Sequence, residues 1–240
     1  MLDQAGAENV TSLSPLRQVA DRGFALHVHG SDFLPDVAYQ SIFSCQELQC
    51  HTGSPSRPAE LAAACNFFNT SYLRCDVAAW PYAAATARIR IQRGDVLVDL
   101  GGRGDNLFTF TPVWNSLEVY EGTSTNQEWL RVYGHGLHAA LNLSCVFERG
   151  GVTQKTAADE VRSDKFLCRV APWPHLESGL ANFSVSYNEG EVLTSRRGPV
   201  LFRYAESFDS ILPSSGHSLG SQVITLFGGG FSATRRDDLD

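Results

Sequence analysis

Long apolar stretches are missing from this sequence. No run of apolar residues approaches the roughly 18 needed to span a bilayer, so we expect no membrane insertion by this segment. The first twenty residues also lack the apolar centre of a signal peptide. Positive charge is in deficit, with 19 Lys and Arg against 26 Asp and Glu and a net charge of −7. We therefore expect no nucleic-acid partner.

The sequence motifs of catalysis and of metal binding are absent as well. The sequence contains neither Gly-x-Ser-x-Gly nor His-Glu-x-x-His, which mark common hydrolases. No Cys-x-x-Cys occurs, so the two close ligand pairs of a zinc ribbon are missing. We therefore expect a protein that is not an enzyme and holds neither a metal nor a cofactor.

Cysteine and glycosylation patterns point to an oxidising compartment. The chain of 240 residues is 43% hydrophobic, enough for a core, and it has an even number of cysteines, which favours disulfides: Cys45, Cys50, Cys65, Cys75, Cys145 and Cys168. Nine asparagines and 36 serines and threonines predict about 1.4 Asn-x-Ser/Thr sequons by chance. Four are present: Asn9, Asn69, Asn142 and Asn182. We expect an extracellular glycoprotein.

An internal repeat organises the chain. The segments 73–82 and 166–175 are similar, and they place Cys75 and Cys168 93 positions apart, as they do Trp80 and Trp173. A third element reads apolar-x-apolar-x-Gly-x-x-apolar at three places, around Gly30, Gly134 and Gly228.

The first copy is longer than the second by about eleven residues. Gly30 and Gly134 are 104 positions apart, whereas Gly134 and Gly228 are 94 apart. Spacing from glycine to cysteine, and from cysteine to cysteine, places the excess in two loops. Six cysteines can pair in fifteen ways, and matching the two copies favours one of them. It pairs Cys145 with Cys168 in the second copy, Cys45 with Cys75 in the first, and Cys50 with Cys65 inside the insertion.

Alternating residues predict short strands, for example at 87–91, 129–133 and 182–187. Turn signals with glycine follow two of them, at 93–95 and 188–190. The best helix candidate is 58–65, with proline in the first turn. About seven short strands in roughly 90–95 residues are typical of an immunoglobulin-like sandwich.

The third copy carries the clearest family signature. Ile211-Leu-Pro-Ser-Ser-Gly216 followed by Gly228-Gly-Gly-Phe231 resembles the start of IPT/TIG domains, the immunoglobulin-like modules of plexins and Met-type receptors. In that family an Ile-x-Pro-x-x-Gly turn opens the first strand, and a later strand ends in Gly-x-Gly-Phe. The Cys145 to Cys168 segment, with Ala157 and Val161 between, is similar to the family's cysteine pattern.

The resemblance implies an all-β fold of tandem immunoglobulin-like (IPT/TIG, E-set type) β-sandwiches. The expected division is a tail at 1–10, a first sandwich with a disulfide-stapled insertion at 11–111, a second sandwich at 112–204 and the start of a third at 205–240. Since 36 residues cannot complete a sandwich, we expect the natural protein to continue past Asp240.

The function implied by the resemblance is adhesion, recognition or a stalk at a cell surface, as part of a receptor-like ectodomain. The partner would be a protein, including a second copy of this chain, or a glycan. The alternative is an accessory, non-catalytic module of a secreted carbohydrate-active enzyme. Neighbouring sequence would separate the two, because a hydrolase domain favours the second.

Four other features have simple structural interpretations. Arg103-Gly104-Asp105 spells an integrin-type motif but lies in a glycine-rich segment that predicts a turn. His27 and His29 share one face of a strand, where a third metal ligand is not identifiable. The run 228–230 lacks the lysine of a phosphate loop. The repeated Trp80 and Trp173 are expected in the core rather than in a sugar platform.

Overall fold

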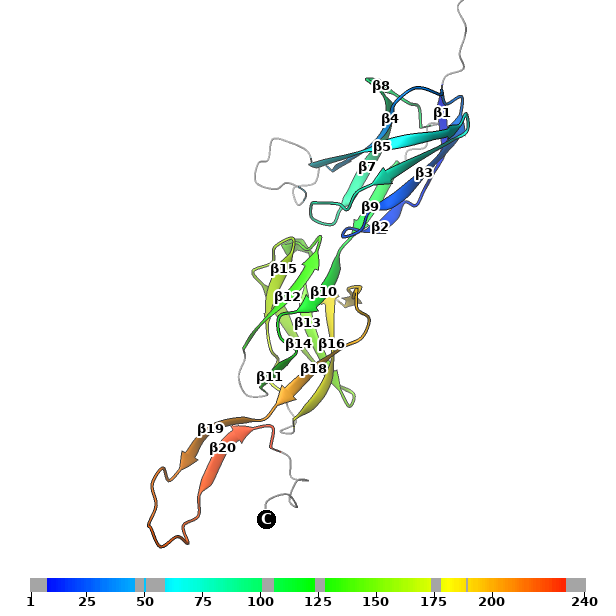
Figure 1. Cartoon of the computed structure of the whole chain (residues 1–240). Coiled ribbons are helices and arrows are strands. Elements are labelled where there is room, and N and C mark those ends of the chain that lie inside the picture. Colours follow the sequence, from blue (N-terminus) through cyan, green and yellow to red (C-terminus); the bar gives the residue numbers. More distant parts are fainter. Residues whose placement is uncertain are drawn as a thin grey trace, which may run out of the picture. The chain divides into compact units, whose positions relative to one another are not determined.

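The computed structural model describes residues 8–45, 50, 59–100, 106–123, 128–173, 178–188 and 190–231. Within these ranges the regular secondary structure is almost all β-strand, and helix is confined to short 3₁₀ turns such as Ala139–Leu141. The chain divides into two compact units, one of Met1–Val113 with Gly134–Ala140 and one of Trp114–Tyr133 with Leu141–Asp240. The prediction of an all-β fold is confirmed (Figure 1).

The first unit holds one curled sheet. Its strands are β1 (Asn9–Ser14), β2 (Arg17–Val19), β3 (Phe24–Ser31), β4 (Tyr39–Cys45), β5 (Ala59–Asn69), β6 (Tyr72–Val77), β7 (Thr86–Arg93), β8 (Val96–Leu97) and β9 (Leu107–Thr111). The order is β1-β3-β6-β5-β4-β7-β9-β2, with β8 on β7. Because β1 pairs with β3 and β2 pairs in parallel with β9, the opening strands join both edges and close the sheet into a sandwich.

The second unit repeats this topology strand for strand. Its strands are β10 (Val113–Leu117), β11 (Glu121–Thr123), β12 (Trp129–His135), β13 (Ser144–Arg149), β14 (Val152–Asp159), β15 (Lys165–Arg169), β16 (Gly179–Tyr187), β17 (Glu191–Val192) and β18 (Val200–Ala205). The order is β10-β12-β15-β14-β13-β16-β18-β11, with β17 on β16. β11 and β18 form the parallel pair that matches β2 and β9.

Period-two burial explains why these segments are strands. Along β7, Ala87, Ile89 and Ile91 are buried while the residues between them face outward. Aromatic rings fill the space between the two halves of the sheet. The ring of Phe24 on β3 stacks on that of Phe108 on β9, with centroids 4.9 Å apart. The strands expected at 87–91, 129–133 and 182–187 are confirmed.

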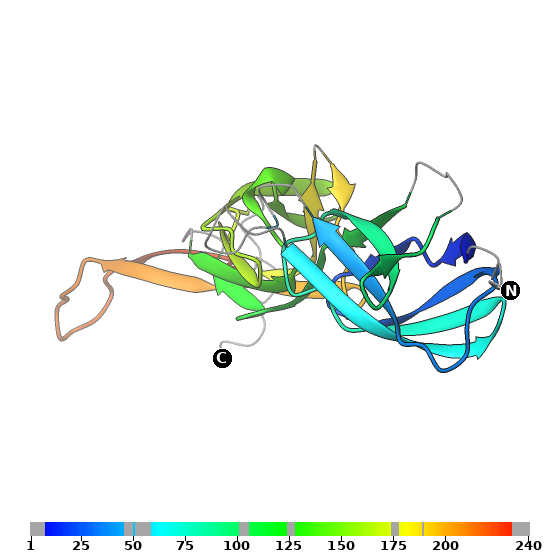
Figure 2. The same ribbon diagram turned by 90° about the horizontal axis from the view of Figure 1, so that it is seen from above.

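The helix expected at 58–65 is wrong. Residues 59–65 are the first half of β5 and pair with β4, so that Cys45 lies opposite Ala59 and Tyr39 opposite Cys65. The two strands lie side by side in Figures 1 and 2. Alanine has the highest helix propensity of the amino acids, but intrinsic propensity is a weak preference. Here the ladder of hydrogen bonds with β4 and the burial of Ala59 and Ala63 override it.

A glycine lets two backbones meet where the first strand of each repeat pairs with the third. A Cβ atom at Gly30 on β3 would collide with the carbonyl oxygen of Asn9 on β1 and lie 2.7 Å from the ring of Phe33. A Cβ at Gly134 would lie 2.6 Å from the carbonyl oxygen of Val113. The apolar-x-apolar-x-Gly-x-x-apolar motif is therefore a packing motif, in which the last apolar side chain covers the glycine.

The same contact recurs a third time, in a hairpin formed by β19 (Ser207–Leu212) and β20 (Thr225–Gly229), which we call the third hairpin because it opens the third repeat of the glycine motif. At Gly228 an added Cβ would collide with the carbonyl oxygen of Ser207 and lie 2.7 Å from the ring of Phe231. The register of this hairpin shifts between Phe208 and Ser210, as that of β1 and β3 shifts between Val10 and Ser12. This hairpin repeats the geometry of β1 and β3.

The apolar side chains of the third hairpin are not buried, however. Val28 of β3 is fully buried, whereas Leu226, its match on β20, is 53% exposed. Phe33 is likewise fully buried, whereas Phe231 is 45% exposed. Among the described residues, no strands cover this face of β19 and β20 as β7 and β9 cover β3.

Gly30→Ala should destabilise the first unit by about 3 kcal/mol, because the new methyl group meets backbone rather than a flexible side chain. Gly94→Asn is the matched control, since a side chain there has open space and asparagine tolerates its positive φ of 55°. Denaturant unfolding measures both. Equal effects of the two substitutions would contradict the packing role of Gly30.

Candidate functional site

All six cysteines are in disulfides, but two predicted pairings are wrong. The structure joins Cys45 to Cys50 and Cys65 to Cys75, where the repeat had predicted Cys45–Cys75 and Cys50–Cys65. It also joins Cys145 to Cys168, the pair expected for the second copy. The first unit therefore has two short-range bonds and the second unit one bond between β13 and β15.

Strand register explains the difference. Ala87 on β7 lies opposite Phe108, and Ala181 on β16 lies opposite Phe202, so the matching residues of these strands are 94 positions apart.

The same spacing matches Ile91 with Val185. Opposite Ile91 on β4 lies Ser41, and opposite Val185 on β13 lies Cys145. Ser41, and not Cys45, therefore occupies the place of Cys145.

Cys75 consequently has no thiol across the sandwich from it. Ser41 is fully buried, and its hydroxyl donates to the carbonyl oxygen of Ala63 at 3.5 Å. Cys75 bonds instead to Cys65, which lies directly opposite on β5 with the two Cα atoms 3.8 Å apart. Ser41 follows Gly30 by 11 positions, as Cys145 follows Gly134, so the extra residues lie in one hairpin between β4 and β5 and not in two loops.

The two repeated tryptophans are core residues, as predicted. Trp80 is fully buried, stacks on Phe110 with centroids 4.2 Å apart, and donates its indole N–H to the carbonyl oxygen of Ala83 at 2.8 Å. Trp173 is 4% exposed and contacts Tyr204 with centroids 5.0 Å apart. Neither ring presents a face on which a sugar could stack.

The glycine run 228–230 and the Arg103-Gly104-Asp105 motif are the two remaining sequence features. Gly228 lies within β20 and makes the close backbone approach described above, while Gly230 follows the strand with a φ of 82°. The Arg103-Gly104-Asp105 motif lies outside the described residues.

His27 and His29 share an outward face with aromatic residues of β5 and β6. The Nδ1 atom of His27 and the Oη atom of Tyr72 share a hydrogen bond of 2.6 Å. The rings of His29 and Tyr72 stack with centroids 5.1 Å apart, and those of Phe68 and Tyr72 lie 5.3 Å apart. We call these four residues the Tyr72 platform. Among the described residues, no three His, Cys, Asp or Glu side chains gather to hold a metal ion.

The four sequons lie in different surroundings. Asn9 is half-buried on β1, with the Oδ1 atom enclosed. Asn142 is exposed and has a φ of 48°. Asn182 is exposed in the middle of β16, between two paired strands. Asn69 is exposed at the end of β5, beside the Tyr72 platform. The sequence identified this sequon but not the aromatic cluster next to it.

The second unit has its own exposed aromatic residue on β12, the strand that corresponds to β3. Trp129 of β12 is 47% exposed and lies opposite Arg169 of β15, whose guanidinium carbon is 4.2 Å from the ring centroid. Arg131 and Tyr133 follow on the same outward face of β12. We call these four residues the Trp129 face. Trp, Tyr and Arg are the residue types that dominate protein-binding hot spots.

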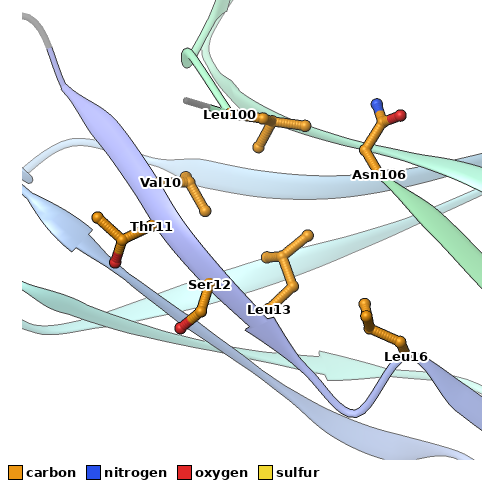
Figure 3. Close-up of a pocket in the computed structure, with 7 residues that line it drawn as sticks. All are labelled: Val10, Thr11, Ser12, Leu13, Leu16, Leu100 and Asn106. Atoms are coloured by element: carbon orange, nitrogen blue, oxygen red, sulfur yellow. The ribbon is translucent and has the colours of Figure 1, made fainter. Parts of the chain in front are cut away.

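A small apolar groove lies between β1 and the segment that leads into β9 (Figure 3). Val10, Thr11, Ser12 and Leu13 of β1 line it, together with Leu16, Leu100 and Asn106. Its volume is about 110 Å³, whereas pockets for small ligands are typically about 300–1,000 Å³. The groove is too small for a ligand-binding site of the usual kind.

Two buried tyrosines hold elements together by hydrogen bonds. Tyr39 accepts from the backbone N–H of Leu34 at 2.9 Å and donates to Glu8, which also pairs with Arg93 at 3.0 Å. Burial and the bond to Glu8 raise the pKa of Tyr39. Tyr204 donates to the carbonyl oxygen of Ala171 at 3.0 Å, and burial raises the pKa of Tyr204 above its ordinary value.

No protein-family profile matches the chain, and no curated protein sequence does. Among solved structures it is similar to the plexin A4 full extracellular region, domains 1 to 10, with 16% identical residues and a TM-score of 0.35. The match covers 88% of this chain and 18% of that one, so the chain spans about a fifth of that protein's length. No helix among the described residues has the length and apolarity to cross a membrane.

Removing Cys145–Cys168 with two alanine substitutions should lower the free energy of unfolding by about 3 kcal/mol, because it closes a loop with a sequence separation of 23. Removing Cys45–Cys50, with a separation of 5, should cost about 2 kcal/mol. Denaturant unfolding measures the costs, and mass spectrometry of non-reduced peptides checks the pairing. Detection of Cys45–Cys75 would refute the register assignment.

Tyr204→Phe should flatten the loss of stability at alkaline pH. The raised pKa means that the folded state holds the phenol proton more tightly than the unfolded chain, in which tyrosine titrates near 10. The stabilisation is therefore complete below about pH 10 and falls as pH rises above it. At pH 7 the variant should lose about 1 kcal/mol with its hydrogen bond. The free energies of unfolding of wild type and variant should converge between pH 7 and pH 11, and a constant difference between them would disprove this role.

Proposed function

We propose that this chain is part of an extracellular, non-enzymatic recognition or adhesion module built of tandem IPT/TIG-type sandwiches. The observation that carries the proposal is the strand-for-strand repetition of one topology in β1–β9 and β10–β18, followed by a third hairpin of the same geometry. In this proposal the repeats are 11–111 and 112–204, and a third repeat begins at 205. The IPT/TIG signature around Pro213 and Gly216 supports the family assignment.

The disulfides support an extracellular location. Three bonds use all six cysteines, and proteins of reducing compartments rarely retain such bonds. The four sequons fit the same compartment, since N-glycans are added in the secretory pathway.

The Trp129 face supports a protein partner rather than a small ligand. A half-exposed tryptophan stacked on an arginine offers a large, rigid contact area with a hydrogen-bonding rim. The partner is a protein on a cell surface, and a second copy of this chain would also qualify.

Beads coated with the secreted chain test the proposal in three assays: bead aggregation, binding to cells before and after surface proteolysis, and binding to insoluble polysaccharides. We expect aggregation or protease-sensitive cell binding. Trp129→Ala should weaken that interaction about tenfold or more, while Val192→Ser, at an exposed residue of β17, should leave it unchanged. Binding to polysaccharide alone would overturn the proposal in favour of a carbohydrate-enzyme accessory module, and free thiols in the secreted chain would contradict the extracellular location.

A further inference from the structure

The Tyr72 platform presents apolar surface that the fold itself does not cover. Phe68 is 57% exposed, and its ring contact is with Tyr72. The register of β5 and β6 shifts between Phe67 and Asn69, so Phe68 is the extra residue of a bulge. A bulge re-aims a side chain, here toward the outer face of the sheet.

Asn69 stands directly beside this platform. It pairs with Tyr72 across a two-residue turn, and residues opposite each other in an antiparallel ladder project to the same face with Cβ atoms about 5 Å apart. The Oδ1 atom of Asn69 accepts from the backbone N–H of Ser71 at 2.9 Å and from its hydroxyl at 2.8 Å. These bonds engage Oδ1 and fix the amide in one orientation.

The two other sequon asparagines that lie on strands, Asn9 and Asn182, lack this arrangement. Asn182 lies opposite Glu148 on one side and Leu201 on the other, so no aromatic ring adjoins it in the ladder. Asn9 has an enclosed Oδ1 atom and a neighbouring strand against its backbone. Only the asparagine beside the Tyr72 platform combines an exposed amide with an exposed aromatic surface among these described strand residues.

We propose that Asn69 carries an N-linked glycan whose first N-acetylglucosamine packs on Phe68 and Tyr72. The proposal rests on the extracellular location proposed above. The donor is a lipid-linked oligosaccharide pyrophosphate of the secretory membrane: Asn69 Nδ2 bonds to the anomeric carbon, the bond from that carbon to the pyrophosphate oxygen breaks, the lipid pyrophosphate leaves and Nδ2 gives up one proton. No change of oxidation state occurs.

The packing follows from the chemistry of the sugar. One face of a pyranose ring carries C–H groups, and burying it against an aromatic ring removes apolar area from water on both sides. The glycan then occupies the Tyr72 platform. The protein partner binds elsewhere, which agrees with its proposed binding to the Trp129 face. Glycosylation at Asn69 is therefore a stabilising part of the first unit.

A double-mutant cycle on the full chain secreted from eukaryotic cells tests the proposal. Asn69→Gln removes the glycan in the wild-type background and again in a Phe68→Ala background, so the effect on the turn is common to both and cancels. We expect loss of the glycan to lower the thermal midpoint by about 4 °C with Phe68 present and by much less with Phe68→Ala. Asn182→Gln is the matched control and should shift the midpoint equally in both backgrounds.

Two further measurements make the outcome decisive. Trimming the glycan to a single sugar should keep the midpoint, and the N-acetyl methyl resonance of that sugar should lie upfield of its position in the Phe68→Ala variant. An unoccupied Asn69, or equal midpoint losses in the two backgrounds, would overturn this inference while leaving the extracellular proposal intact. Failure to be secreted with three disulfides would instead overturn the proposed location, and this inference with it.

Discussion

Closure of one curled sheet around an aromatic layer is the constraint on which each unit depends. The opening strand must hydrogen-bond to both edges, first beside β3 and then beside β9. That path brings the backbones of β1 and β3 too close for a Cβ atom at Gly30, and it seats Phe33 over the gap. Once closed, the sheet stacks the rings of Phe24 and Phe108 against each other. The glycine motif, the aromatic core and the parallel edge pair are thus consequences of a single geometric requirement.

The repeats preserve this geometry while their cross-links differ. Cys75 and Cys168 occupy matching places, opposite Leu26 and Leu130 of their neighbouring strands. The partner position across the sandwich is cysteine in the second unit and Ser41 in the first. A disulfide contributes chiefly by constraining the unfolded chain, so it can be relocated without changing the folded topology. The aromatic packing, by contrast, is present in both units.

Sequence reasoning was sufficient wherever local pattern and global fold agree. Alternation at 87–91 and the glycine motif led directly to strands and to the hairpin contact, because both are set by the backbone. It failed at 58–65, where alanine-rich composition favoured a helix that pairing with β4 overrides. It failed for Cys45 because cysteines were aligned with cysteines, whereas the spacing of 11 from Gly30 points to Ser41. The cluster around Tyr72 depends on a bulge, which sequence spacing does not reveal.

The central claim is that the same sandwich is built twice, with Ser41 at the position of Cys145. The most direct measurement is mass spectrometry of non-reduced peptides from the double variant Ser41→Cys with Cys65→Ser, which moves a thiol to the matching place. The account predicts a disulfide between position 41 and Cys75, in a folded protein that keeps Cys45–Cys50. Free thiols at both positions in the folded variant would contradict the equivalence of the two units.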